Sequence, residues 1–328
     1  MDRRDAACTF AVLGATAFRA MAQPSPKAVR VGFLYFGSRK AANDTGRFEA
    51  FRKGMKELGY IEGANLSIEA RFAESNAARI GEVVNELLRF KPDVIVATGS
   101  PTYCALAKAA ANVPVVVTVT VDPVAEGMAT TVARPGGNFT GLTDTALALG
   151  PKQLEILVAA VPRITRIAIL QNPDNTSHPL QVEGIAAEAR RIGKQVQGVA
   201  VRTSQELENG FETMMRERVD ALIVLNYTFF TDQIRAIAEL TRKHRLPAAY
   251  SPSQFAENGG LISYGADLTE NFRRAARYVD RILKGARPAE LPFEQPTKYA
   301  MIINRGSAKA LGVTIPAALL LRADQVID

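Results

Sequence analysis

The sequence predicts an α/β fold of two Rossmann-like lobes, each a parallel sheet flanked by helices, joined by a hinge that the chain crosses several times. Short apolar runs alternate with segments of helical periodicity along most of the 328 residues, which is typical of parallel sheets covered on both faces. An aspartate-led strand, a polar loop, a helix and a proline-led strand occur in this order at residues 93–114 and again at 220–247. This repeat indicates two similar lobes.

The first 22 residues have the layout of a secretory signal peptide. Arg3 and Arg4 precede a run of small and apolar residues at 6–18, and an Ala-Met-Ala cleavage pattern ends at Ala22. We therefore expect residues 1–22 to be a signal peptide cleaved after Ala22, with export to the periplasm by the Sec or the twin-arginine route. A cytoplasmic tail is the alternative.

Four strands are predicted in the first half of the chain, and helical periodicity separates them. The apolar runs lie at residues 29–36, 66–72, 93–97 and 113–121. Phe48, Phe51 and Met55 recur at helical spacing after the first strand, and Gly59 ends this helix. A second helix carries the apolar stripe of residues 80–88, and an alanine-rich helix follows residue 100.

A turn-rich segment at residues 133–138 marks the passage to the second lobe, and a short extended segment at 139–143 follows it. The same alternation then returns. Apolar runs predict strands at 166–171, 196–201, 220–225 and 247–250, and helices are expected at 151–161, 182–192, 205–218 and 231–244.

The last elements do not fit two independent domains. A strand is predicted at residues 259–265, a helix at 271–283, a strand at 299–303 and a closing helix through Leu311. If these elements return to the first lobe and then to the second, the chain crosses between the lobes three times, which makes a hinge beside a cleft. We expect a first lobe of residues 28–140 plus 263–291 and a second lobe of residues 141–262 plus 292–328.

Candidate binding residues lie where the predicted strands end, because ligands of open parallel sheets bind beyond the carboxyl ends of the strands. Aromatic rings beside short polar groups suit a small organic solute. Local roles are the alternative, since Ser100 and Thr102 can cap a helix, and Asn172 and Asn175 can form a turn. The candidates are Tyr35, Phe36, Ser38, Thr98, Ser100, Thr102, Thr120 and Asp122 in the first lobe, and Asn172, Asp174, Asn175, Asn226, Tyr227, Tyr250 and Ser251 in the second.

Asp122 is the strongest single candidate in this set. It follows a buried strand, precedes Pro123 and lies at the exit toward the hinge. We expect its carboxylate to pair with an ammonium group of the ligand, and the alternative is a local turn in which the side chain accepts from the backbone.

Composition and motifs exclude other classes of protein. No window approaches the ~20 consecutive apolar residues of a membrane span. The formal charge is +7, but the positive side chains are spread over helix faces, as at Arg273, Arg277 and Arg281, so we expect no nucleic-acid partner. The dinucleotide, NTP-binding and hydrolase signatures are missing, so we expect no enzyme, no cofactor and no catalytic residue.

The two histidines and the cysteine outside the signal peptide have ordinary structural explanations. His178 and His244 are far apart in the sequence and have no neighbours typical of metal ligands, so we expect no metal site. Each lies at an end of a predicted helix, where we expect the imidazole to face solvent or the helix dipole. Cys104 lies among alanines on a predicted helix, where we expect a small buried thiol.

Several ordered motifs resemble the ABC-transporter substrate-binding proteins of the TrpX-like type. They are ELGYIEGANL at 57–66, the strand and loop at 93–101, VTVTVDPV at 117–124, RPGGNFTGLTD at 134–144 and AKALGVTIP at 308–316. The resemblance implies a periplasmic-binding-protein fold of the first type, with two lobes and a three-stranded hinge. It also implies delivery of a small-molecule solute to an ABC permease and its ATPase, and we expect a monomer that is not embedded in the membrane.

The ligand and two other functions stay open at this point. Tyr227, Phe229 and Phe230 depart from the acidic and polar loop expected in amino-acid-binding relatives, which favours an aromatic or less polar solute. The expected ligand is a small organic solute, either an amino acid or an aromatic compound. A ligand-sensing domain of a LacI-like regulator shares the fold but requires a helix-turn-helix, and fewer than thirty residues precede Val29. A sensory receptor not coupled to transport is the other alternative.

Overall fold

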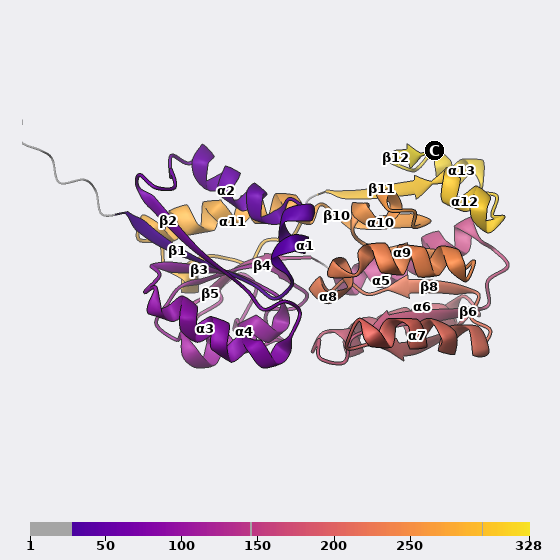
Figure 1. Ribbon diagram of the computed structural model, residues 1–328, viewed down its shortest axis with the longest axis horizontal. Coiled ribbons are helices and arrows are strands. Elements are labelled where there is room, and N and C mark those ends of the chain that lie inside the picture. The colour runs from indigo at the N-terminus through magenta and orange to yellow at the C-terminus, as the bar shows by residue number, and fades with distance from the viewer. Residues whose placement is uncertain (1–27, 145, 297) are drawn as a thin grey trace, which may run out of the picture.

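Two α/β lobes lie side by side along the long axis of the molecule in the computed structural model (Figure 1). The structure describes residues 28–144, 146–296 and 298–328. The expected signal peptide lies outside these residues.

The first lobe is built on a five-stranded sheet whose neighbouring strands are all parallel, in the order β2-β1-β3-β4-β5. The register aligns Tyr35 of β1 with Thr98 of β3, so the carboxyl ends of these central strands lie side by side. The strands are β1 (Val29–Tyr35), β2 (Leu66–Phe72), β3 (Val94–Thr98), β4 (Val115–Thr120) and β5 (Phe139–Thr143).

The second lobe is built on a seven-stranded sheet in the order β12-β11-β10-β9-β8-β6-β7. Read from its other edge, the parallel part runs β7-β6-β8-β9-β10, which repeats the strand order of the first sheet. The predicted repeat of the two lobes is therefore confirmed. The strands are β6 (Arg166–Gln171), β7 (Gln195–Ala200), β8 (Ala221–Val224), β9 (Ala248–Tyr250), β10 (Ile262–Ala266), β11 (Tyr299–Asn304) and β12 (Gln325–Ile327).

Only β10 and β11 pair antiparallel among the strands described. Strand β11 enters the second lobe from the first lobe, after the last crossing, and therefore runs against β10. Strand β12, which the sequence did not predict, pairs parallel to β11 and forms the edge of the sheet.

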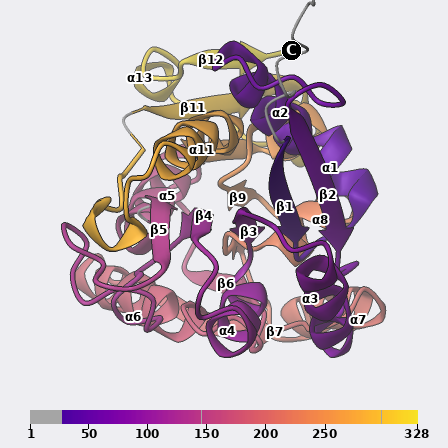
Figure 2. The same cartoon turned by 90° about the vertical axis from the view of Figure 1, so that its left-hand side faces the viewer.

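Helices cover both faces of each sheet, as Figure 2 shows for the first lobe, where α2 and α11 lie on one side of the strands and α3 and α4 on the other. In the second lobe, α7 and α9 lie on one face, and α5, α6 and α12 on the other. The helices are α1 (Arg39–Asp44), α2 (Arg47–Glu57), α3 (Ile80–Arg89), α4 (Ser100–Ala109), α5 (Ala146–Ala160), α6 (His178–Arg191), α7 (Gln205–Arg216), α8 (Thr228–Asp232), α9 (Ile234–Lys243), α10 (Ser253–Glu257), α11 (Leu268–Leu283), α12 (Arg305–Leu311) and α13 (Ala317–Leu320), with 3₁₀ turns η1 (Ala77–Arg79) and η2 (Pro288–Glu290).

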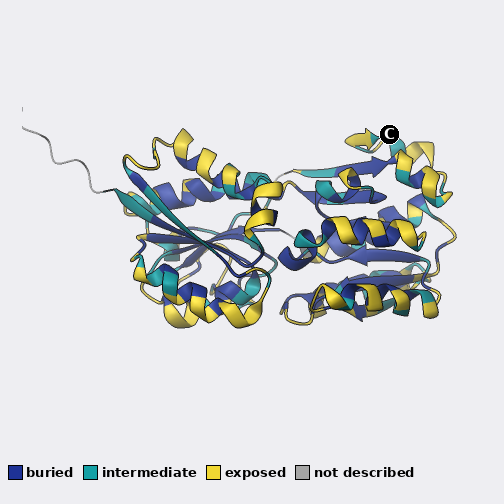
Figure 3. Ribbon diagram, viewed as in Figure 1, coloured by how far each residue is buried: buried dark blue, intermediate teal, exposed yellow. Residues whose placement is uncertain are grey.

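Side-chain alternation along the strands explains how the two faces of each sheet are filled. In β1, Val31 and Phe33 pack under α2 and α11, whereas Leu34 packs under α3 and α4, because successive side chains of a strand point to opposite faces. Figure 3 shows the result, with buried strands inside and the outer faces of the helices exposed.

One apolar cluster spans both lobes. It joins the α3 and α4 face of the first sheet to the α7 and α9 face of the second. Phe36 and Tyr227 meet where the lobes touch, with ring centroids 5.6 Å apart and planes 28° from parallel. The lobes are therefore in direct apolar contact as well as joined by the chain.

The chain crosses between the lobes three times: from β5 to α5, from β10 to α11, and from η2 to β11. Helix α11 follows the second-lobe strand β10 but packs in the first lobe against α2. The expected boundaries after residues 140 and 262 lie inside β5 and at the start of β10, and strand pairing assigns β5 to the first sheet and β10 to the second. The exact domain limits beyond this pairing stay a prediction.

Several elements differ in extent from the prediction. The helix expected at 231–244 is two helices, α8 and α9, which divide at Gln233. Helix α5 begins at Ala146 rather than at Pro151. A Cβ on Gly150 would lie 2.7 Å from Ile185 Cγ1, so the absence of a side chain there lets the first turns of α5 pack closely on α6.

The expectation of a buried thiol at Cys104 is wrong. Helix α4 turns Tyr103 and Leu106 toward the sheet, and Cys104 lies off this face and is exposed. The alanine-rich sequence of α4 has little amphipathic contrast, so periodicity could not identify its buried side.

Candidate functional site

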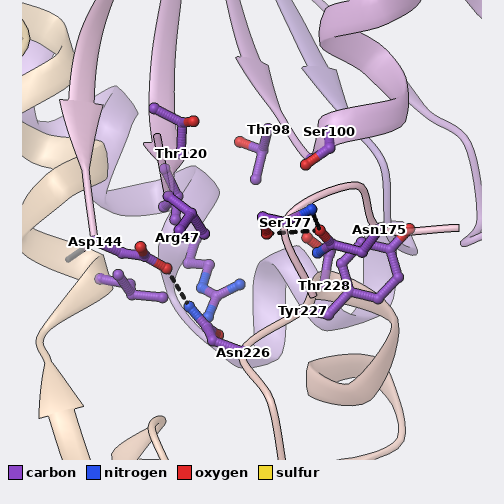
Figure 4. Close-up of a pocket in the computed structure, with 14 residues that line it drawn as sticks. Arg47, Thr98, Ser100, Thr120, Asp144, Asn175, Ser177, Asn226, Tyr227 and Thr228 are labelled. Carbon is purple, nitrogen blue, oxygen red and sulfur yellow. Dashed lines mark hydrogen bonds between the residues drawn. The ribbon is translucent and has the colours of Figure 1, made fainter. Parts of the chain in front are cut away.

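A cavity lies between the lobes, where the carboxyl ends of the two parallel sheets face each other (Figure 4). It encloses about 430 Å³ of empty space, part of which is open to solvent. Such a position beyond the strand ends is where open α/β sheets bind ligands. The lining residues are Arg47, Thr98, Gly99, Ser100, Val119, Thr120, Val121, Asp144, Asn175, Ser177, Asn226, Tyr227, Thr228 and Leu268.

Thr98, Gly99 and Ser100 form the first-lobe wall, where β3 passes into α4. The Thr98 hydroxyl lies 2.6 Å from that of Thr118, within hydrogen-bonding distance. Gly99 has φ of 101°, and a Cβ there would lie 2.6 Å from Phe36 Cβ, so glycine is required at this turn. Ser100, the first residue of α4, lines the cavity, so the positive end of the helix dipole borders it. Of the next two residues, Pro101 has no N–H, and the Thr102 N–H donates to the Gly99 carbonyl oxygen at 2.9 Å.

Arg47 is a buried cation at the edge of the cavity. It opens α2, is only 4% exposed, and donates from Nη1 to the Tyr35 hydroxyl at 3.0 Å. Figure 4 shows its side chain projecting toward the second lobe. Arg47 also borders a second space between the lobes, which has about 840 Å³ of empty volume and includes Ser251, Gln254 and Asp267 in its lining.

Asp144 supplies the opposite charge in the same cavity. It directly follows β5 and is buried, and its Oδ2 accepts a hydrogen bond from Asn226 Nδ2 at 2.9 Å across the lobes (Figure 4). The cavity thus brings together an acidic and a basic side chain with several hydroxyl and amide groups. This donor and acceptor set can hold a polar organic molecule.

Tyr227 forms the aromatic wall from the second lobe. Its ring stacks on Phe36 and meets the His178 ring edge-on at a centroid distance of 5.5 Å. Burial raises the pKa of the hydroxyl, whose oxygen has no hydrogen-bond partner in the described part of the chain. Beside it, Asn175 Oδ1 accepts from the Ser177 backbone N–H at 2.9 Å, which fixes the polar turn before α6.

His178 is fully buried behind Tyr227, so the expectation that it faces solvent or a helix dipole is wrong. Its Nδ1 accepts from the Asn172 backbone N–H at 2.9 Å, and its ring stacks on Phe230. Burial lowers its pKa to about 4. The imidazole is therefore neutral at physiological pH and supports the aromatic wall.

Hydrogen bonds that Asp232 accepts join the lobes beside the cavity. The Asp232 carboxylate in α8 accepts from the Ser38 backbone N–H at 2.8 Å and from the Ser75 hydroxyl at 2.7 Å. Burial raises its pKa to about 6, although these two hydrogen bonds and Arg47 act in the opposite direction. These contacts hold the two lobes together in the described conformation.

The structure brings part of the predicted site together. Six of the fifteen candidates line the cavity: Thr98, Ser100, Thr120, Asn175, Asn226 and Tyr227. Ser251 lines the second space between the lobes, and Ser38 caps α1 and lines a groove between α1 and α8.

The other seven candidates do not line the cavity, and most have visible structural roles. The Tyr35 hydroxyl accepts from Arg47, Phe36 stacks on Tyr227, Thr102 donates to the Gly99 carbonyl oxygen, and Tyr250 is fully buried. Asn172 Oδ1 accepts from the Asp174 backbone N–H, as the alternative of a local turn predicted, and Asp174 is exposed.

Asp122 is placed in a turn at the end of the first sheet. Its Oδ1 accepts from the backbone N–H groups of Val124 at 2.9 Å and Ala125 at 3.0 Å. The geometry is that of the local turn considered as the alternative to ligand contact. Its pairing with a ligand ammonium stays a prediction without a cavity position to support it.

Eight lining residues were not predicted: Arg47, Gly99, Val119, Val121, Asp144, Ser177, Thr228 and Leu268. Asp144 follows a strand of the first sheet, as Asp122 does, and the rule of strand ends applied to residues 139–143 could have identified it. Arg47 begins a helix, and two residues separate it from the end of α1. No signal in the sequence marks it, because its approach to the second lobe depends on tertiary packing.

The part of the chain that the structure describes contains no cluster of three His, Cys, Asp or Glu side chains arranged to hold a metal ion. No helix in the same residues has the length and apolar character needed to span a membrane.

Comparison with known proteins supports these observations. The family model of the ABC transporter substrate binding protein matches residues 42–327. A relative from Clostridioides difficile named tyrosine-binding protein is 23% identical over 263 residues, which are 80% of this chain and 75% of that protein.

Solved structures resemble most of the chain. An ABC domain from Streptococcus pneumoniae in complex with L-Trp has a TM-score of 0.83 and 26% identity, covering 92% of this chain and all of that one, 100%. A conserved domain protein from Vibrio cholerae has a TM-score of 0.85 at 26% identity, with coverage of 92% and 100%. The family match favours substrate binding over the LacI-like alternative, and this chain belongs to the ABC transporter substrate binding protein family.

Proposed function

We propose that this chain is an exported receptor that binds an aromatic solute between its two lobes, an aromatic amino acid foremost. The observation that carries this proposal is the cavity itself. One wall has the Tyr227 ring, and the others have the Asp144 carboxylate and the hydroxyl groups of Thr98, Ser100 and Thr120. An aromatic ring of the solute can stack on Tyr227, and an ammonium group of the solute can pair with the Asp144 carboxylate.

The relatives agree with this ligand class. One is named a tyrosine-binding protein, and another was solved in complex with L-Trp. The contacts of Tyr227 with His178 and Phe230, in its own lobe, keep its ring in place before any ligand arrives. A preorganised ring loses little conformational freedom on binding, which favours affinity.

The three chain crossings support a binding mechanism by hinge closure. Rotation about the crossings opens the space between the strand ends, and Asp232, Ser38 and Ser75 join when the lobes meet. We propose that the closed form is presented by a monomer to an ABC permease and its ATPase in the periplasm. The signal-peptide layout of residues 1–22 and the family membership support this location.

We also propose that the receptor performs no chemistry on its solute. The family to which the chain belongs is one of substrate-binding proteins. Mass spectrometry of a solute recovered after prolonged incubation should return the unchanged compound, and a new product would contradict this part of the proposal.

The test is calorimetry and thermal unfolding of the purified protein with L-tyrosine, L-tryptophan and L-phenylalanine, and with L-alanine and glucose as controls. A solute present at 100 times its dissociation constant should raise the free energy of unfolding by about 2.7 kcal/mol. Stabilisation by the aromatic compounds alone supports the proposal. Binding of labelled DNA without any stabilising solute would instead support the regulator alternative.

A further inference from the structure

Arg47 is charged and buried, yet no carboxylate of the described residues touches its guanidinium, although Asp144 lines the same cavity and Asp232 lies close enough for Arg47 to lower its pKa. The Arg47 side chain is covered from solvent to 4% exposure, and its hydrogen bond to the Tyr35 hydroxyl uses Nη1 alone. Across residues 28–144, 146–296 and 298–328, no ion pair to its guanidinium is present. A buried cation that contacts no carboxylate is unfavourable, and proteins usually pair such groups directly.

The carboxylates nearest to this region are engaged elsewhere. Asp144 accepts from Asn226, and Asp232 accepts from Ser38 and Ser75. Asp267, in the lining of the second space, accepts from the Thr269 backbone N–H at 2.9 Å and caps α11. None of them forms an ion pair with Arg47 among the described residues, so its guanidinium fork holds no carboxylate there.

Arg47 also borders both spaces between the lobes. Its guanidinium Cζ lies 5.9 Å from the Phe272 ring centroid, and its Nη1 donates to the Tyr35 hydroxyl. These two first-lobe contacts fix the orientation of the side chain. The N–H groups that the Tyr35 hydroxyl does not occupy are available toward the cavity. Five donors in a rigid plane match a carboxylate through two parallel hydrogen bonds.

We infer that Arg47 determines specificity by requiring a carboxylate on the solute, which it binds in the cavity between the lobes. This inference rests on the proposed function and deepens it, because it assigns the recognition of the acidic group to a residue outside the strand-end loops. The first turn of α4 reinforces it, since the positive end of the helix dipole favours negative charge at the same cavity. Asp144 then lies in the same cavity for the ammonium group of an amino acid.

The experiment compares acids with their neutral amides, so that ring and size stay constant. The test compounds are L-phenylalanine with L-phenylalaninamide, and phenylacetate with phenylacetamide, measured by calorimetry on the wild type, Arg47→Met, Arg47→Lys and Arg52→Met. Arg52 is the matched control, since it lies on the same helix and faces solvent in ion pairs with Glu49 and Glu62. In the wild type and in Arg52→Met, each acid that binds should bind at least about tenfold more tightly than its amide.

In Arg47→Met this preference should vanish, and Arg47→Lys should restore part of it, because lysine keeps the charge without the planar fork. A preference for the acid that persists in Arg47→Met would overturn the inference while the proposed function stands. Binding of amides as tightly as acids by the wild type would overturn it in the same way.

If none of the four compounds binds, the proposed ligand class fails. Thermal unfolding without ligand then still tests the inference about Arg47. The measurement uses a Tyr35→Phe background, so that no Tyr35 hydroxyl is left without its partner when Arg47 is replaced. In this background Arg47→Met should unfold at an equal or higher temperature than the Tyr35→Phe parent, because it removes a buried charge that contacts no carboxylate. A clearly lower unfolding temperature, restored by Arg47→Lys, would identify Arg47 as a structural residue and overturn the inference.

Discussion

The carboxylate of Asp232, in the second lobe, accepts a hydrogen bond from the backbone N–H of Ser38, in the first lobe, at 2.8 Å. The same oxygen accepts from the Ser75 hydroxyl, and the other oxygen has no partner within the described residues. Burial is the main reason that the pKa of this carboxyl is raised to about 6, and Glu74 adds to the effect. Contact between the lobes is therefore linked to the protonation of one side chain.

This linkage predicts that acidification favours contact between the lobes. When the lobes separate, water reaches Asp232, and its pKa should return toward about 3.9. The closed form then binds more protons than the open form between about pH 4 and pH 6, so closure becomes more favourable as the pH falls through about 6. Small-angle scattering should show a smaller radius of gyration at about pH 5 than at about pH 7.

Asp232→Asn should abolish this pH dependence, because the amide cannot ionise. Asp174→Asn is the control, since Asp174 is an exposed aspartate of the same lobe whose ion-pair partner, Arg202, also lies in that lobe. If Asp232→Asn and the wild type change their radius of gyration equally with pH, Asp232 does not control the closure.

The burial of His178 predicts that acidification destabilises the whole fold, whereas it favours contact between the lobes through Asp232. The pKa of His178 is lowered to about 4 by burial, from 6.5, so the unfolded chain binds a proton that the folded chain does not bind between these values. The free energy of unfolding therefore decreases as the pH falls from about 6.5 toward 4. Between about pH 7 and pH 5 the decrease should be about 2 kcal/mol.

Urea unfolding at these two pH values measures this loss, and it is best done in the Asp232→Asn background because Asp232 titrates in the opposite sense. His178→Gln should unfold with a smaller pH dependence than its parent, although its stability at neutral pH is lower. An undiminished pH dependence in His178→Gln would show that other groups cause the acid destabilisation.

The two-lobed fold could be predicted because the same hydrogen-bonding arrangement of an aspartate occurs once in each lobe. Asp93 accepts from the Arg30 backbone N–H at 2.7 Å, and Asp220 accepts from the Thr165 and Arg166 backbone N–H groups at 2.8 and 2.9 Å. Each aspartate, at the start of one strand, thus satisfies donors at the start of the neighbouring strand. This shared role explains why both strands follow an aspartate in the sequence.

The site was predicted less completely, because strand ends indicate an edge of a sheet but not which side chains turn inward. Thr98 and Asn226 follow the rule and line the cavity, whereas Tyr250 obeys the same rule and is buried in the core. Arg47 reaches the cavity from a helix, through packing against residues far away in the sequence such as Tyr35 and Phe272. Local sequence contains no information about this approach.

Gly99→Ala should destabilise the protein by about 1–3 kcal/mol. The residue has φ of 101°, and the new Cβ would lie 2.6 Å from Phe36 Cβ, so both the backbone and the contact between Phe36 and Tyr227 are strained. Gly81→Ala is the control, since nothing lies within 4 Å of its Cβ position in α3. It should be stabilising by up to about 1 kcal/mol. Chemical unfolding of both variants checks the contrast, and equal effects would contradict it.

Tyr227→Phe should leave the ligand-free protein as stable as the wild type or more stable. The hydroxyl oxygen is buried without a partner in the described chain, and removing such a group relieves a desolvation penalty. The ring and its stacking on Phe36 remain. Thermal unfolding without ligand should show no loss, and calorimetry with the aromatic amino acids then reveals whether the hydroxyl contacts the solute, as a loss of affinity. A large loss of stability without ligand would contradict the geometry.

Asp144 and Asp122 offer a direct comparison of two aspartates at neighbouring strand ends. Asp144 lines the cavity and is held by Asn226, whereas the Oδ1 of Asp122 closes a turn with Val124 and Ala125. If Asp144 meets the ammonium group of the solute, Asp144→Asn should weaken binding of L-phenylalanine by at least about tenfold, because a charge-assisted hydrogen bond is lost.

The same substitution should affect phenylacetate little, since that acid has the ring and the carboxylate but no ammonium group. Asp122→Asn should leave the affinities for both compounds unchanged, because asparagine can accept the same two backbone hydrogen bonds in the turn. Calorimetry on the two variants with the two compounds distinguishes the roles. A selective loss of L-phenylalanine binding in Asp122→Asn, with Asp144→Asn unaffected, would return the ammonium site to Asp122 and require the turn at residues 122–125 to rearrange on binding.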